Sequence, residues 1–170
     1  MPLLNTAQAY GTLPKILHWL LVVLLLAMVI SGQTMGVNEN IQAFHEILGK
    51  VILGLATLRL ALRLAAPVPR PNPAHKTWEV HLARFIHWGF YLSLFALPIS
   101  GWVMVSAGDF AMTGALPAWL APYALEPVAY STHKFFKIAL LTFAALHSVG
   151  ALKHLIIDRD DTFARMWFGK

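Results

Sequence analysis

Three features of the sequence predict an all-α fold, an integral membrane four-helix bundle. Of the 170 residues, 58% are hydrophobic and only 12% are charged, and the mean hydropathy is +0.61, a value that soluble domains of this size rarely reach. Four long apolar segments alternate with stretches rich in proline, glycine and polar residues, as in a chain that crosses a bilayer several times. The basic residues flank these segments and form no block, so the net charge of +5 indicates membrane topology rather than nucleic-acid binding.

The chain is expected to form one domain, residues 1–170. The four helices are expected at about residues 16–31, 41–66, 78–105 and 131–158. Pro14 precedes the first helix, and alternating prolines after the second stop it and favour extended backbone. The tail, residues 159–170, is expected to hold a short interfacial helix capped by Asp161 or Thr162. We expect no internal repeat.

Cysteine is absent from the sequence. Its absence excludes disulfides, thiolate metal sites and the covalent attachment of a c-type haem. A chain this short also leaves no room for a separate soluble catalytic domain beside four helices. Any cofactor must therefore be held inside the bundle by other side chains.

The distribution of basic residues predicts the orientation, because cytoplasmic ends retain lysine and arginine. With the N-terminus inside, ten basic residues are cytoplasmic: Lys15, Arg59, Arg63, Arg70, Lys76, Arg84, Lys153, Arg159, Arg165 and Lys170. Only three are on the outer side: Lys50, Lys134 and Lys137. Both termini are therefore expected in the cytoplasm.

The fourth segment carries three histidines on one face. His133, His147 and His154 are separated by fourteen and seven residues, steps that return to within about 40° and 20° of the same helix face. The rise from His133 to His147 is about 21 Å, which places them in opposite halves of a bilayer. Two imidazoles at two depths of one apolar helix suggest a ligand for each of two stacked haems, with His154 at the inner edge.

The remaining histidines can be sorted by depth. His45 begins a segment that enters from outside and shares the outer half with His133, so these two form the expected outer pair. His18 and His87 begin segments that enter from inside and share the inner half with His147. The inner pair must be chosen from these three. Intramembrane ionisable residues are costly and are therefore functional candidates.

Space for a porphyrin gives a partial criterion. Gly49 lies one turn after His45, and small residues follow His147 at the same spacing, whereas aromatic residues follow His87. Bulky residues also follow His133, so the criterion does not decide the inner pair.

Two arginines and two further histidines have open interpretations. Arg59 and Arg63, one turn apart, can either pair with propionates of the inner haem or extend to lipid headgroups. His75 and His81 flank the proline-rich linker and are given no role.

Four blocks of the sequence resemble the bacterial cytochrome b561 family. These are YGTLPKILHWL, AFHEILGKVILGLATLRLALRL, HLARFIHWGFYLSLFALPISG and ALHSVGALKHLIIDRDDTFARMW, and together they cover nearly the whole chain. The resemblance implies a multi-pass protein of the bacterial inner membrane with two haem b groups. Its implied haem ligands are His18, His45, His133 and His147. It also implies electron exchange with ubiquinone near the inner haem, where His87 and His154 match recurrent positions.

Three functions follow as hypotheses. The first is an oxidoreductase that passes electrons from periplasmic superoxide to ubiquinone. The second is a non-enzymatic conduit or anchor subunit for a periplasmic redox or apolar-ligand protein, favoured by the proline- and aromatic-rich outer stretch, residues 115–130, and by outer loops without basic residues. The third is a haem-free helical bundle. His154, near neutral in intrinsic pKa, could deliver protons to a quinone or bond a lipid headgroup.

Overall fold

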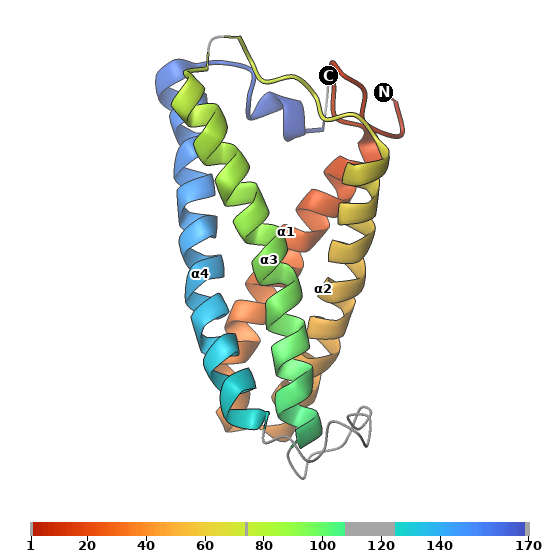
Figure 1. Ribbon diagram of the computed structural model, residues 1–170, viewed down its shortest axis with the longest axis vertical. Coiled ribbons are helices and arrows are strands. Elements are labelled where there is room, and N and C mark those ends of the chain that lie inside the picture. Colours follow the sequence, from red (N-terminus) through yellow and green to blue (C-terminus); the bar gives the residue numbers. More distant parts are fainter. Residues whose placement is uncertain (1, 74, 108–124, 169–170) are drawn as a thin grey trace.

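The computed structural model describes residues 2–73, 75–107 and 125–168, and these residues form helices without a β-strand. The four long helices are α1 (Thr12–Thr34), α2 (Glu39–Ala65), α3 (Thr77–Ala107) and α4 (Glu126–Lys153). Three short elements are the 3₁₀ helices η1 (Met35–Val37) and η3 (Ala164–Met166) and the π-helical turn η2 (His154–Asp158). The long helices run side by side along the molecule (Figure 1). The predicted all-α class is confirmed.

Two helices begin earlier than the sequence pattern predicts, and both contain a proline in their first turn. α1 starts at Thr12 rather than near residue 16, and α4 starts at Glu126 rather than at residue 131. Proline is tolerated there because the first N–H groups of a helix have no partner within it. Pro14 and Pro127 thus lie inside helices. In the tail, the expected helix is only the short η3.

Three of the four long helices, α1, α3 and α4, are long and apolar enough to cross a membrane. α2 has 27 residues but is more highly charged, with Lys50 and Arg59 on it and Glu39 in its first turn. Large hydrophobic side chains are exposed on the outside of the bundle, among them Leu26, Leu92 and Ile138. This pattern fits a protein surrounded by lipid.

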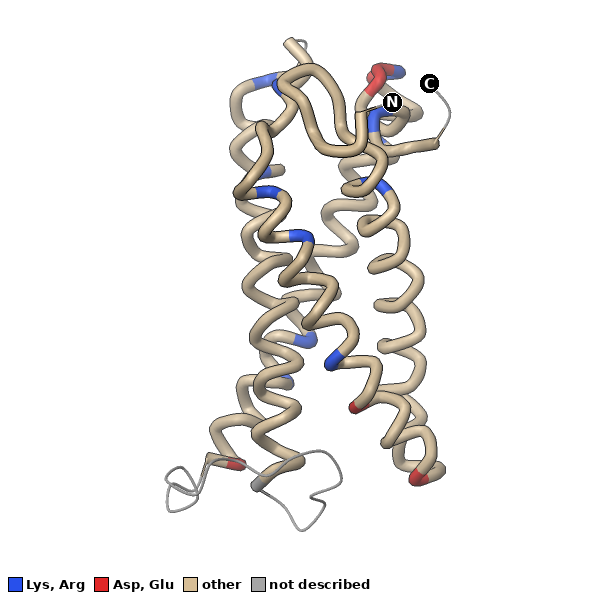
Figure 2. The backbone as a smooth tube through the Cα atoms, turned by 90° about the vertical axis from the view of Figure 1, so that its right-hand side faces the viewer, with Lys and Arg blue, Asp and Glu red and all other residues tan. Residues whose placement is uncertain are grey.

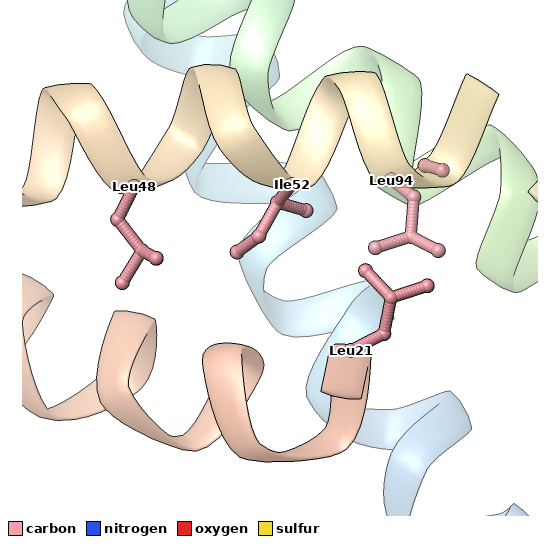
Figure 3. Close-up of a cluster of buried hydrophobic side chains, with 5 residues drawn as sticks. Leu21, Leu48, Ile52 and Leu94 are labelled. Atoms are coloured by element: carbon pink, nitrogen blue, oxygen red, sulfur yellow. The ribbon is translucent and has the colours of Figure 1, made fainter. Parts of the chain in front are cut away.

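The buried core is a small cluster between α1, α2 and α3. Leu21, Leu48, Ile52 and Leu94 point toward one another (Figure 3), and Ala56 completes the cluster with no exposed surface. Along α2 these positions fall between His45 and Arg59. The apolar contacts therefore hold the helices together at mid-height and separate the outer histidines from the inner ones.

The end of the bundle that holds both termini is closed by the C-terminal tail (Figure 1). Lys15 Nζ donates to the Trp167 carbonyl at 3.0 Å, and Trp19 Nε1 donates to the Met166 carbonyl at 2.9 Å. Arg165 reaches carbonyls of the N-terminal segment and of the α2–α3 linker. These bonds tie three distant parts of the chain together over the inner histidines.

Charge is distributed unequally along the molecule. Figure 2 shows most Lys and Arg residues in the half that holds both termini, whereas acidic residues lie both at that end and toward the far tips of the helices. At the far end, Glu39 and Glu126 lie in the first turns of α2 and α4; Asp109 lies outside the described residues. The helix arrangement therefore groups the basic residues as the sequence analysis expects.

Candidate haem-binding sites

His45 lies near the start of α2 and faces the end of α1. Its Nδ1 is 2.9 Å from Ser31 Oγ, and the same hydroxyl donates to the Met28 carbonyl at 3.0 Å. A Cβ on Gly32 would come within 3.1 Å of His45 Cε1. A side chain at position 32 would therefore require the imidazole to shift by a few tenths of an ångström.

His133, near the start of α4, has the same surroundings at the end of α3. Its Nδ1 lies 3.2 Å from Ser100 Oγ and 3.0 Å from the Leu97 carbonyl. A Cβ on Gly101 would come within 3.4 Å of His133 Cε1. The imidazoles of His45 and His133 are close enough to interact electrostatically, so the structure brings the expected outer pair together.

Three imidazoles meet in the other half of the bundle. The ring centres of His18 and His147 are 6.1 Å apart with an interplanar angle of 74°, and those of His87 and His147 are 5.5 Å apart. The ring of Phe90 lies edge-on to His147 at 5.6 Å. The structure thus places all three inner candidates at one level, with His147 in the middle.

Arg59 lies beside this group. It interacts electrostatically with His18 and His147, and its Nη1 donates to the Pro14 carbonyl at 3.0 Å. Arg59 and Arg63 both line a cavity of about 30 Å³ that also contains Tyr91. The guanidinium groups are thus turned toward the bundle and the closed end rather than only toward lipid.

The donor set fits haem iron. Two imidazoles on opposite faces of one iron have nitrogens about 4 Å apart and ring centres about 6 Å apart, because a metal–imidazole bond is about 2 Å long. The His18–His147 spacing of 6.1 Å meets this requirement. A Cβ on Gly150 would meet no atom within 4 Å, and one on Gly49 only a methionine side chain at 3.5 Å. The inner candidates therefore have the spacing of two ligands of one iron, and Gly49 and Gly150 leave open space beside His45 and His147.

A separate cluster forms at the inner end, around His154. Its Nδ1 lies 2.9 Å from Asp158 Oδ2 and 2.8 Å from Asp160 Oδ2. His75 Nε2 lies 3.2 Å from the same Asp160 oxygen and 3.0 Å from Thr162 Oγ1, and the two imidazole centres are 4.4 Å apart. Burial alone would raise the pKa of Asp160, but hydrogen bonds from Thr162 and His154 hold that pKa well below its ordinary value.

Sequence reasoning gave His75 no role, because nothing local relates it to a residue 79 positions away. The π-helical turn His154–Asp158 and the left-handed backbone of Arg159, at a φ of 51°, reverse the chain and return Asp160 to His154. His81, the other unassigned histidine, is exposed on α3. His87 and His154 are not brought into one contact group: His87 joins the inner imidazoles, and His154 joins His75.

Comparison with known proteins shows the family of this chain. A family model described as prokaryotic cytochrome b561 matches residues 9–169. The chain is also similar to cytochrome b561 homolog 2 of Escherichia coli (strain K12), with 28% identity over 178 residues, covering 98% of this chain and 95% of the relative. Family membership implies an inner-membrane electron-transfer protein that binds b-type haem. This chain belongs to the prokaryotic cytochrome b561 family.

Proposed function

We propose that this chain is a di-haem transmembrane cytochrome b that moves electrons between a periplasmic donor and ubiquinone near the cytoplasmic side. The observation that carries the proposal is the pairing of histidines from different helices at two levels, His45 with His133 and His18 with His147. These four histidines would be the axial ligands. Arg59 and Arg63 would neutralise propionates at the inner level.

The haems would supply electron transfer without oxygen binding, because each iron would be held by two histidines of this chain. The residues of this chain fix where that transfer occurs. His45 and His133 would hold the outer haem, and His18 and His147 would hold the inner haem. The two levels are about 21 Å apart along α4, the helical rise from His133 to His147. The apolar cluster around Ile52 excludes water between the levels.

At the cytoplasmic side we propose a quinone site near His87 and His154. Reduction of a quinone needs protons as well as electrons, and an imidazole at the water boundary can supply them. Nδ1 of His154 lies within bonding distance of the carboxylates of Asp158 and Asp160, which accept from it; these contacts fix the ring orientation and direct Nε2 away from the carboxylates. His87, next to His147, would be the group nearest to both the haem and the quinone.

The proposed topology is four passes with both termini in the cytoplasm. α2 lacks the apolar composition of the other three, but it packs beside α1 and α3 and has a comparable length. Reporter fusions after Gly36 and within residues 111–127, most of which lie outside the described residues, should report a periplasmic location. Fusions after Pro71 and Lys170 should report the cytoplasm. A periplasmic C-terminus would invert the assignment of both haems.

Superoxide is the leading donor, and its capture should depend on two lysines. An anion is attracted by positive potential, an effect that weakens with ionic strength. Lys134 and Lys137 follow His133 on α4, are exposed, and Lys137 interacts electrostatically with His133. In stopped-flow measurements, the Lys134→Gln/Lys137→Gln variant should reduce the rate of haem reduction by superoxide by about tenfold.

The matched control is the Lys76→Gln/Arg84→Gln variant, which removes two exposed positive charges at the opposite end of the bundle. It should leave the rate unchanged. With ubiquinone present, the reduced haems should be reoxidised. A near-diffusion-limited rate that is insensitive to both lysines and to salt would contradict the charge argument.

A negligible superoxide rate in the wild type would favour the second function, a conduit or anchor subunit for a periplasmic redox or apolar-ligand protein. The proline- and aromatic-rich stretch, residues 115–130, supports this alternative because aromatic residues are enriched at protein interfaces. Of this stretch, residues 115–124 lie outside the described residues.

A further inference from the structure

The surroundings of His45 and His133 are duplicated within the chain. α1 and α3 each contain the pattern His-Trp, ten residues, Ile-Ser-Gly: His18 to Gly32 in α1 and His87 to Gly101 in α3. The expectation of no internal repeat is therefore wrong; the repeat was missed because the ten intervening residues differ in α1 and α3. The contacts reveal it, since each Ser-Gly pair faces one histidine of the following helix.

The following helices extend the repeat. Fourteen residues after His45 comes Arg59, and fourteen residues after His133 comes His147. Both reach the same inner group, because both interact electrostatically with His18. α1–α2 and α3–α4 are thus two copies of one unit, which match at the outer level and differ at the inner level, where an arginine replaces a histidine.

The hydrogen bonds determine which ring nitrogen of each outer histidine carries the proton. Ser31 and Ser100 each donate their only hydroxyl hydrogen to the carbonyl three residues earlier in their own helix. Their oxygens can therefore only accept from Nδ1 of His45 and His133. The Leu97 carbonyl, which has no proton to donate, bonds the same nitrogen of His133, and the Met28 carbonyl bonds the His45 ring.

We propose that Ser31 and Ser100 are positioning residues of the outer haem site: each accepts Nδ1–H of its histidine and so presents the unprotonated Nε2 to the iron. This inference rests on the proposed function of His45 and His133 as ligands. Gly32 and Gly101 contribute by leaving room for Cε1 of the same rings. A ligand imidazole that donates its other N–H becomes more basic and favours ferric iron.

The test is a redox titration of the purified, haem-loaded Ser31→Ala/Ser100→Ala variant. Its carbonyl acceptors remain, so we expect both haems to be retained. Loss of the two hydroxyl acceptors should shift the ferric–ferrous equilibrium of the outer haem toward the ferrous state by about threefold to tenfold. The reduction potential of this haem should therefore rise, and a tenfold shift is 59 mV for one electron. The low-spin ferric EPR signal of that haem should shift or broaden, and the inner haem should be unchanged.

Ser93→Ala is the matched control, because Ser93 is fully buried in α3 and bonds the Gly89 carbonyl of its own helix in the same way. It should leave both potentials as in the wild type. The Ser31→Thr/Ser100→Thr variant keeps the hydroxyls and should restore the outer potential. If Ser31→Ala/Ser100→Ala has the same outer-haem potential and EPR signal as Ser93→Ala, the two serines are not positioning residues. That result would overturn the inference but not the proposed haem sites. Absence of an outer haem from the wild type would overturn the proposed function as well.

Discussion

His45→Ala and His133→Ala should each remove the same haem, the outer one, and leave the inner haem in place. The two histidines come from different helices, α2 and α4, and lie close enough to interact electrostatically. Each substitution would remove one of the two proposed ligands of this haem, and a single remaining histidine would hold the iron far less strongly. Haem content should therefore fall from two to about one per chain, as measured by the pyridine haemochrome assay.

His81→Ala is the control for this pair, because it removes an exposed histidine from α3 and should retain both haems. The double variant His45→Ala/His133→Ala should lose no more haem than either single variant. Loss of a second haem in the double variant, or of different haems in the two single variants, would show that the histidines do not share one iron.

At the inner level, His18→Ala and His147→Ala should remove the second haem, whereas His87→Ala should retain it. The 6.1 Å spacing of the His18 and His147 rings is closer to the spacing of two ligands of one iron, about 6 Å, than the 5.5 Å spacing of His87 and His147. Retained haem in His87→Ala should show slower reoxidation by ubiquinone. Stopped-flow measurements and haem quantitation separate these effects.

The opposite pattern of haem loss would assign a different pair of inner ligands. If His87→Ala abolishes the inner haem and His18→Ala does not, then His87 and His147 are the inner ligands. His18, in the corresponding position of the first repeat, would then be the neighbour without an iron bond.

The sequence predicts the levels of the histidines well because a helix converts spacing into position. Fourteen residues between His133 and His147 fix both the face and the depth, and the structure places these residues in separate groups with His45 and His18. The sequence could not decide between His18 and His87 as the inner ligand, because both histidines begin helices at the same end of the bundle. That choice depends on ring spacings, which appear only when the helices are packed.

Contacts between distant segments were the least predictable part. The bond between His75 and Asp160 depends on the π-helical turn after Lys153 and on the positive φ of Arg159, an uncommon conformation for a residue with a side chain. The contact of Lys15 with the C-terminal tail was equally hard to predict. The sequence counts it as a cytoplasmic charge, but it is only 5% exposed and bonds the Trp167 carbonyl, since the C-terminal tail folds back over α1.

The haem content of the purified protein tests the central claim most directly. Haem is extracted into acidified organic solvent and compared with the protein concentration from amino-acid analysis. The four proposed histidine ligands and the absence of cysteine predict two haem b per chain, all of it extractable. One haem per chain, or haem that stays with the protein, would contradict the account.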